Sequence, residues 1–118
     1  MKFRGVMIGS DNPEALGAFY TNVLGEPGFR ESSWFGWDDG AQLIIGSHSE
    51  VSSENVLPQR IILTLEVNDV LGSFEKVRAL GAPVVAEPYK PDPSSENWLA
   101  TLKDPDGNFI QLSTPWRG

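Results

Sequence analysis

The chain has 118 residues, of which 40% are hydrophobic, a length and apolar content typical of one compact domain with its own core. It has no cysteine and a single histidine, His48, which excludes disulfides, thiolate metal sites and any site that needs two histidines. Nine basic against sixteen acidic residues give a net charge of −7, and without a basic cluster we expect no nucleic-acid partner.

The first half of the chain predicts the element order β-α-β-β-β. Asn12 supplies a helix N-cap and Pro13 a first helical residue, and apolar residues then recur at helical spacing until Gly25. Strands are predicted around this helix, over residues 3–8, 29–32, 34–37 and 41–47, with a hairpin turn at 38–40.

The second half predicts the same order after a polar link over residues 47–58. Its helix begins at Asn68-Asp69 and ends at Gly81. Its strands are predicted over residues 60–67, 83–86, 98–103 and 108–113, with a proline-rich loop over 87–96 and a turn over 104–107.

The two helices are similar in sequence as well as in position. Leu16-Gly17-Ala18-Phe19 is echoed by Leu71-Gly72-Ser73-Phe74, and both helices end in Leu-Gly. We interpret this as an internal duplication, with module one over 1–56 and module two over 57–118 of a single domain, although short amphipathic helices also resemble each other by chance. The matched glycines, Gly17 and Gly72, predict close packing of each helix on a sheet.

Strand alternation separates a dry face of the sheet from a mixed one. In the strand over 60–67 the apolar set is Ile61, Leu63, Leu65 and Val67, and the opposite set is Ile62, Thr64 and Glu66. A mixed face suits a small-molecule cleft, and it is also what an ordinary half-exposed antiparallel sheet presents.

The duplicated β-α-β-β-β unit contains two distinctive segments: Ala18 to Gly25 in the first helix, and Lys103 to Leu112 around Asp-Pro-Asp-Gly. With these segments the duplicated unit resembles the vicinal-oxygen-chelate superfamily, the glyoxalase, bleomycin-resistance and extradiol-dioxygenase group. The resemblance spans residues 3–115. It implies an α+β fold in which two tandem βαβββ modules form a cupped, partly open barrel, and it implies a homodimer. Because this fold hosts lyases, isomerases, dioxygenases and plain binding proteins, the resemblance leaves the activity open.

The resemblance also implies where a divalent metal would be held. The four ligand positions of the enzymatic members fall on Gly5, Ile44, Ile62 and Gln111. Three of these residues have no donor atom, and one neutral amide does not hold a divalent ion against water. We therefore expect no metal, no cofactor and no catalytic residues of the family type.

The non-enzymatic branch of the superfamily offers a different function. It includes short, acidic bleomycin-resistance dimers that bind a cationic aromatic drug. The resemblance, the charge and four tryptophans lead us to expect metal-independent binding of a small hydrophobic or cationic aromatic molecule, such as an antibiotic or a toxic metabolite. The residues expected to line the site are Met7, Trp37, Ile62, Thr64, Glu66, Trp98, Phe109 and Gln111.

Each role has a chemical reason and a competing interpretation. The aromatic rings would supply stacking area, Thr64 and Gln111 would orient polar groups, and Glu66 would balance a cation. Tryptophans also fill cores and interfaces; Trp34 and Trp37 lie on opposite faces of one strand, so at most one of them lines the site.

Two other functions stay open at this stage. One is a lyase, isomerase or dioxygenase with a non-standard ligand set, for which Glu66 and His48 are the available titratable groups. The other is a partner-binding module without a small-molecule ligand. The longest apolar runs are only a few residues, so we expect a cytoplasmic protein without a membrane partner.

Overall fold

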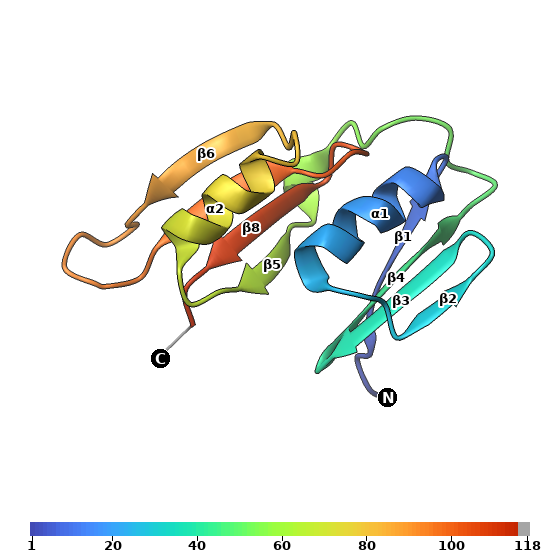
Figure 1. The fold of residues 1–118 in the computed structure, drawn as a ribbon, viewed down its shortest axis with the longest axis horizontal. Helices are drawn as coiled ribbons and strands as arrows, with labels where there is room; N and C mark the ends of the chain where they lie inside the picture. The colour runs from blue at the N-terminus through green and yellow to red at the C-terminus, as the bar shows by residue number, and fades with distance from the viewer. Residues whose placement is uncertain (116–118) are drawn as a thin grey trace. The chain divides into compact units, whose positions relative to one another are not determined.

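The computed structural model describes residues 1–115, and the chain divides into two compact units, Met1–Glu54 and Asn55–Gly118. Each unit holds one four-stranded mixed sheet and one α-helix on one face of that sheet (Figure 1). Trp116, one of the four tryptophans, lies outside the described residues.

The first unit has the order β-α-β-β-β. Its elements are β1 Gly5–Ser10, α1 Pro13–Leu24, β2 Phe29–Glu31, β3 Trp34–Asp39 and β4 Ala41–Ser47. The strand order across the sheet is β1-β4-β3-β2, with β1 parallel to β4 and the other pairs antiparallel.

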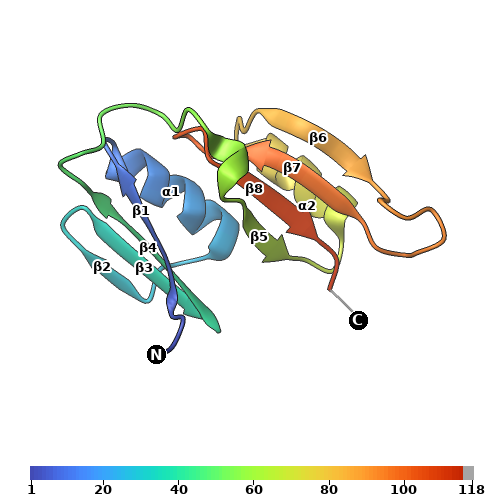
Figure 2. The same cartoon turned by 180° about the vertical axis from the view of Figure 1, so that it is seen from behind.

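The second unit repeats this topology after a short 3-10 helix, η1. Its elements are η1 Pro58–Arg60, β5 Leu63–Glu66, α2 Val70–Arg78, β6 Val84–Tyr89, β7 Leu99–Lys103 and β8 Phe109–Ser113. The strand order across the sheet is β5-β8-β7-β6, again with one parallel pair, β5 and β8 (Figure 2). The α+β class and the two tandem βαβββ modules are thereby confirmed.

Local chemistry fixes the ends of both helices. Asn12 caps α1 by accepting a hydrogen bond from the amide of Ala15 at 3.3 Å, and Asp69 caps α2 by accepting one from Gly72 at 3.0 Å. Gly25 and Gly81 follow the helices with φ of 93° and 94°, a region that favours glycine. The chain therefore leaves each helix at a glycine.

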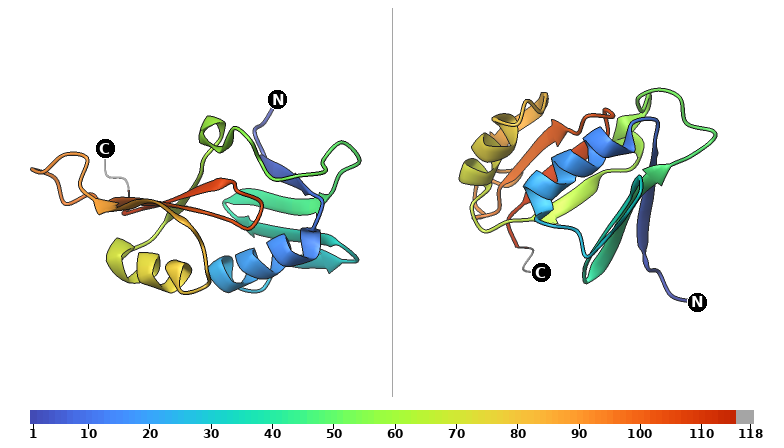
Figure 3. Two further views of the ribbon diagram at one scale, coloured as in Figure 1. Left: turned by 90° about the horizontal axis from the view of Figure 1, so that it is seen from above. Right: turned by 45° about the vertical axis from the view of Figure 1, so that its right-hand side comes forward.

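Each unit has its own core between helix and sheet. In the first unit Leu16, Phe19 and Tyr20 of α1 are buried together with Phe35 and Ile45 of the sheet. In the second unit the buried residues come from α2, β7 and β8: Val70, Phe74, Val77, Ala100, Leu102, Ile110 and Leu112. Figure 3 shows α2 against one face of its sheet, which leaves the other face free of that helix.

Three expectations about element limits are corrected. The first strand begins at Gly5 and extends to Ser10. The fifth begins only at Leu63, after η1, so Ile61 is exposed instead of lying on the covered face. β6 continues to Tyr89 because irregular pairing between Val84 and Tyr89 accommodates Pro88 at the sheet edge, and the loop is therefore shorter than 87–96.

The two matched glycines differ in their surroundings. Gly17 is buried, and an added Cβ would meet the ring of Phe35 at 2.5 Å, which confirms close packing of α1. Gly72 is exposed, and an added Cβ would meet only the side chain of its own N-cap, Asp69, so the expected packing of α2 on its sheet through Gly72 is wrong.

This difference predicts opposite responses to the same substitution. Alanine favours a helix over glycine by about 1 kcal/mol, but overpacking a core costs about 1–3 kcal/mol. Gly17→Ala should therefore lower the free energy of unfolding, because the buried ring of Phe35 has to move. Gly72→Ala should leave it unchanged or raise it, because an exposed carboxylate can rotate. Urea denaturation of both variants tests this, and equal destabilisation would contradict the packing described here.

No helix in residues 1–115 combines the length and the apolar character needed to cross a membrane.

Candidate functional site

The candidate site is the face of the second sheet that points away from α2, which we call the open face. Strand pairing defines it, because paired residues share a face and successive residues alternate. Leu102 and Ile110 pair with each other and are fully buried toward α2. The open face is therefore formed by Thr64 and Glu66 of β5, Leu99, Thr101 and Lys103 of β7, and Phe109, Gln111 and Ser113 of β8.

A row of three uncharged polar side chains crosses the middle of the open face. Thr64 pairs with Gln111, and Gln111 pairs with Thr101 on the next strand. The Thr64 hydroxyl donates to Oε1 of Gln111 over 3.4 Å, a long and weak bond. Neighbouring strands lie about 4.8 Å apart, so this polar row spans about 10 Å. Thr64 is exposed and Gln111 half-buried, whereas Thr101 is buried, with 8% of its surface exposed.

An aromatic ring and a lysine lie beside the polar row. Phe109 pairs with Lys103, and the Lys103 ammonium is 5.9 Å from the centroid of the Phe109 ring. Ile62 precedes β5 and alternates onto the same side as Thr64, with its side chain exposed. Glu66 is exposed and pairs with Ser113, at the other end of β5 and β8. The structure thus brings Ile62, Thr64, Glu66, Phe109 and Gln111 onto one face.

Trp98 lies on the other side of the second sheet. Its amide donates to the Thr114 hydroxyl at 3.1 Å and its carbonyl accepts from the Thr114 amide at 3.2 Å, so the β7–β8 ladder continues one residue beyond Leu99. Since Leu99 belongs to the open face, alternation puts Trp98 on the side of α2.

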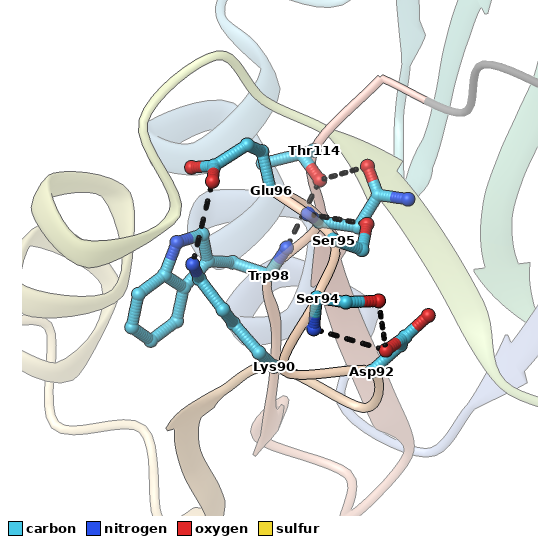
Figure 4. A network of polar contacts seen from close by, with 8 residues as sticks. Lys90, Asp92, Ser94, Ser95, Glu96, Trp98 and Thr114 are labelled. Atoms are coloured by element: carbon cyan, nitrogen blue, oxygen red, sulfur yellow. Dashed lines mark hydrogen bonds and ion pairs between the residues drawn. The ribbon is translucent and has the colours of Figure 1, made fainter.

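The indole of Trp98 already has a cation beside it. The Lys90 ammonium lies 5.5 Å from the ring and 3.7 Å from Oε1 of Glu96 (Figure 4). In the same loop, the hydroxyl and amide of Ser94 both donate to Asp92 and lower the pKa of that carboxyl, the hydroxyl contributing more. Trp98 and its neighbours therefore order the loop between β6 and β7.

The first unit holds the remaining two predicted residues on opposite faces of its sheet. Met7 pairs with Ile44, on the face away from α1, and is exposed. Trp37 is 7% exposed on the face under α1, where its indole N–H donates to the Gly25 carbonyl at 2.8 Å. Trp37 and Met7 are thus separated by the sheet itself.

Sequence reasoning missed Trp34, which shares the face of Met7. The Trp34 ring covers Gly46, leaving no room for a Cβ there, and it is partly exposed. The signal was present in the alternation, which put Trp34 and Trp37 on opposite faces without showing which face the helix covers.

The residues present do not fit the family's metal. Two of the implied ligand positions, Gly5 and Ile44, lie in the first unit, and two, Ile62 and Gln111, in the second; Gln111 alone has a side-chain donor. Within either unit, the described residues contain no group of three or more His, Asp or Glu side chains that could hold a metal ion.

A family model described as a glyoxalase-like domain matches residues 5–113. The chain belongs to the glyoxalase-like domain family. Its structural neighbours include proteins of the glyoxalase, bleomycin-resistance and dioxygenase group, and they share its fold. No protein of curated function matches the sequence significantly.

Three solved structures illustrate the shared fold. A glyoxalase-related enzyme from Fulvimarina pelagi has a TM-score of 0.77 and 20% identity, over 98% of this chain and 88% of that one. A glyoxalase/bleomycin resistance protein/dioxygenase family enzyme from Burkholderia phytofirmans PsJN has a TM-score of 0.75 and 22% identity, over 97% of this chain and 98% of that one. A glyoxalase/bleomycin resistance protein from Albidiferax ferrireducens T118 has a TM-score of 0.75 and 23% identity, over 96% and 98%. At these identities the likeness concerns the fold alone.

Proposed function

We propose that this glyoxalase-like domain protein binds a small planar molecule on its open face without a metal ion. The observation that carries the proposal is the polar row of Thr64, Gln111 and Thr101 next to the ring of Phe109. Small-molecule sites combine apolar walls with a few convergent polar groups, which is the composition of this face.

The roles follow from the side chains. Phe109 and Ile62 provide apolar contact area for a ring, and a phenylalanine ring stacks at little cost in conformational entropy. Gln111 offers an amide that both donates and accepts, and the two threonine hydroxyls do the same. Such a row positions a ligand with carbonyl, hydroxyl or carboxyl substituents.

Binding is favoured over turnover by the positions of Glu66 and His48, the two candidate acid–base groups. Acid–base catalysis needs a titratable side chain beside the reacting atoms, usually one with a second group that adjusts its pKa. Glu66 is exposed and lies at the end of the open face, and His48 belongs to the first unit, where its Nδ1 accepts from the Glu50 amide. We therefore propose that the protein sequesters a metabolite or antibiotic. We further propose that it does so in the cytoplasm as a homodimer, with neither nucleic acid nor a membrane as partner.

The proposal predicts which substitutions weaken binding. After dialysis against EDTA, the protein is titrated with a set of planar aromatic compounds, and amide chemical shifts locate the contacts. Gln111→Ala should lower the affinity of the compounds that shift open-face amides by about three- to tenfold, which corresponds to the loss of one net hydrogen bond. Gln59→Ala, which removes the same side chain from exposed η1, should leave their affinity unchanged.

Two outcomes would count against this function. One is that no compound shifts the amides of β5, β7 and β8. The other is that binding occurs there but responds equally to Gln111→Ala and Gln59→Ala, which would mean that the polar row does not contact the ligand.

A further inference from the structure

Lys103 differs from every other basic residue in the described part of the chain. Arg30, Arg78 and Lys90 each form an ion pair with a glutamate, at 3.5, 2.6 and 3.7 Å. The other basic residues among 1–115 without such a pair are exposed: Lys2, Arg4, Arg60 and Lys76. Lys103 is half-buried, and within residues 1–115 no carboxylate oxygen lies within 4.0 Å of its ammonium.

The surroundings of Lys103 suit an anion. A half-buried ammonium loses hydration, and the Phe109 ring at 5.9 Å replaces only part of it. The carboxylate next in sequence, Asp104, is buried and accepts hydrogen bonds from the amides of Asp106 and Asn108 in the turn. An arriving anion would give Lys103 the partner that no carboxylate among residues 1–115 supplies.

We propose that the open face selects an aromatic carboxylate or a similar planar anion, with its negative group between Lys103 and the polar row. This inference rests on the proposed function and assigns the class of ligand. The rows that hold Lys103 and Gln111 are two residues apart on neighbouring strands, about 7 Å, a gap in which one carboxylate can contact both side chains. The half-buried Gln111 amide then donates to the carboxylate, while the ring lies beside Phe109.

Local charge prevails here over the net charge of −7. The other charged residue of the open face, Glu66, is in the row of Ser113, four residues along β8 from Phe109, or about 13 Å. The Debye length at physiological salt is about 8 Å, so the exposed Glu66 carboxylate is largely screened at the position of Lys103. A cationic ring beside Phe109, by contrast, is repelled by the Lys103 ammonium.

The test uses one ring system in three charge states: 2-naphthoate, 2-naphthylmethanol and 2-naphthylmethylammonium. Each is titrated at neutral pH into the full chain, with amide shifts of β5, β7 and β8 as the readout. We expect the carboxylate to bind about three- to tenfold more tightly than the alcohol, and the ammonium compound to bind most weakly.

Substitutions assign the preference to Lys103. Lys103→Met should bring the naphthoate affinity down to that of the alcohol while leaving the alcohol within about twofold of its original value. Lys103→Arg should keep the preference for the carboxylate, and it serves as the control for a general effect of substitution at this position on folding. Lys76→Met, which removes an exposed lysine of α2 and changes the net charge equally, should have no effect.

The outcomes separate the two proposals. If the alcohol or the ammonium compound shifts the open-face amides and the carboxylate binds no better, the anion preference is wrong and small-molecule binding stands. If Lys103→Met and Lys76→Met reduce naphthoate binding equally, the preference is a net-charge effect and the assignment to Lys103 is wrong. If none of the three compounds shifts these amides, both proposals fail for planar rings.

Discussion

Trp37→Ala should lower the free energy of unfolding by about 3–5 kcal/mol. The indole is 7% exposed, packs at 6.4 Å from the Tyr20 ring and stacks at 6.3 Å on Phe35. Truncation removes these contacts and also leaves the Gly25 carbonyl without the indole N–H at 2.8 Å. Urea denaturation followed by circular dichroism measures the loss.

Trp34→Ala is the matched control. It removes the same side chain from the same strand, but from the exposed face, where the ring contacts Gly46. We expect less than half the destabilisation of Trp37→Ala. A larger loss for Trp34→Ala would reverse the assignment of the two faces of β3, and with it the description of the first unit's core.

Asp104→Ala should cost about 2–4 kcal/mol, because a buried carboxylate that accepts several hydrogen bonds is removed while its donors remain. Asp104 is 2% exposed, and its oxygens accept from the amides of Asp106 and Asn108 at 2.9 Å and from the Asn108 side chain at 2.9 and 3.2 Å. The Asn108 side chain in turn accepts from Asn55 at 2.9 Å, so the turn anchors the start of the second unit.

Asp39→Ala provides the comparison for Asp104→Ala. Asp39 is an exposed aspartate at the equivalent turn between β3 and β4, and we expect a change within about 0.5 kcal/mol. Equal effects of the two substitutions would show that the hydrogen bonds of Asp104 contribute no more than turn propensity. The Asp-Pro-Asp-Gly segment, which helped to identify the family, is thus explained by stability of the turn.

The sequence was sufficient for most of the fold, because both helices carry caps, apolar periodicity and a terminal glycine. The limits of β6 were less predictable. Pro88 normally ends a strand, and only irregular pairing at a sheet edge lets the strand continue to Tyr89. Likewise, Gly17 and Gly72 are identical in pattern, yet Phe35 lies against only the first of them.

The residues of the candidate site were predictable where the alternation of side chains along a strand assigns them to one face of the sheet. Thr64, Phe109 and Gln111 follow from alternation alone, and the structure places them on one face. Trp37 and Trp98 are different. Alternation separates Trp34 from Trp37 without showing which of them the helix covers, and the strand predicted over 98–103 begins only at Leu99, after Trp98. Lys103 was passed over because an isolated lysine has no sequence signal; its significance comes from half-burial without a carboxylate.

The central claim, binding on the open face without a metal, is tested most directly by one comparison. The affinity of a compound that shifts the open-face amides is measured for protein treated with EDTA and for protein dialysed against zinc, nickel or manganese, with metal content determined by elemental analysis. We predict equal affinities within about twofold and metal content far below one ion per chain after dialysis. Retention of one ion per chain, with binding or turnover that requires it, would contradict the claim and place the protein among the metal-dependent enzymes of its superfamily.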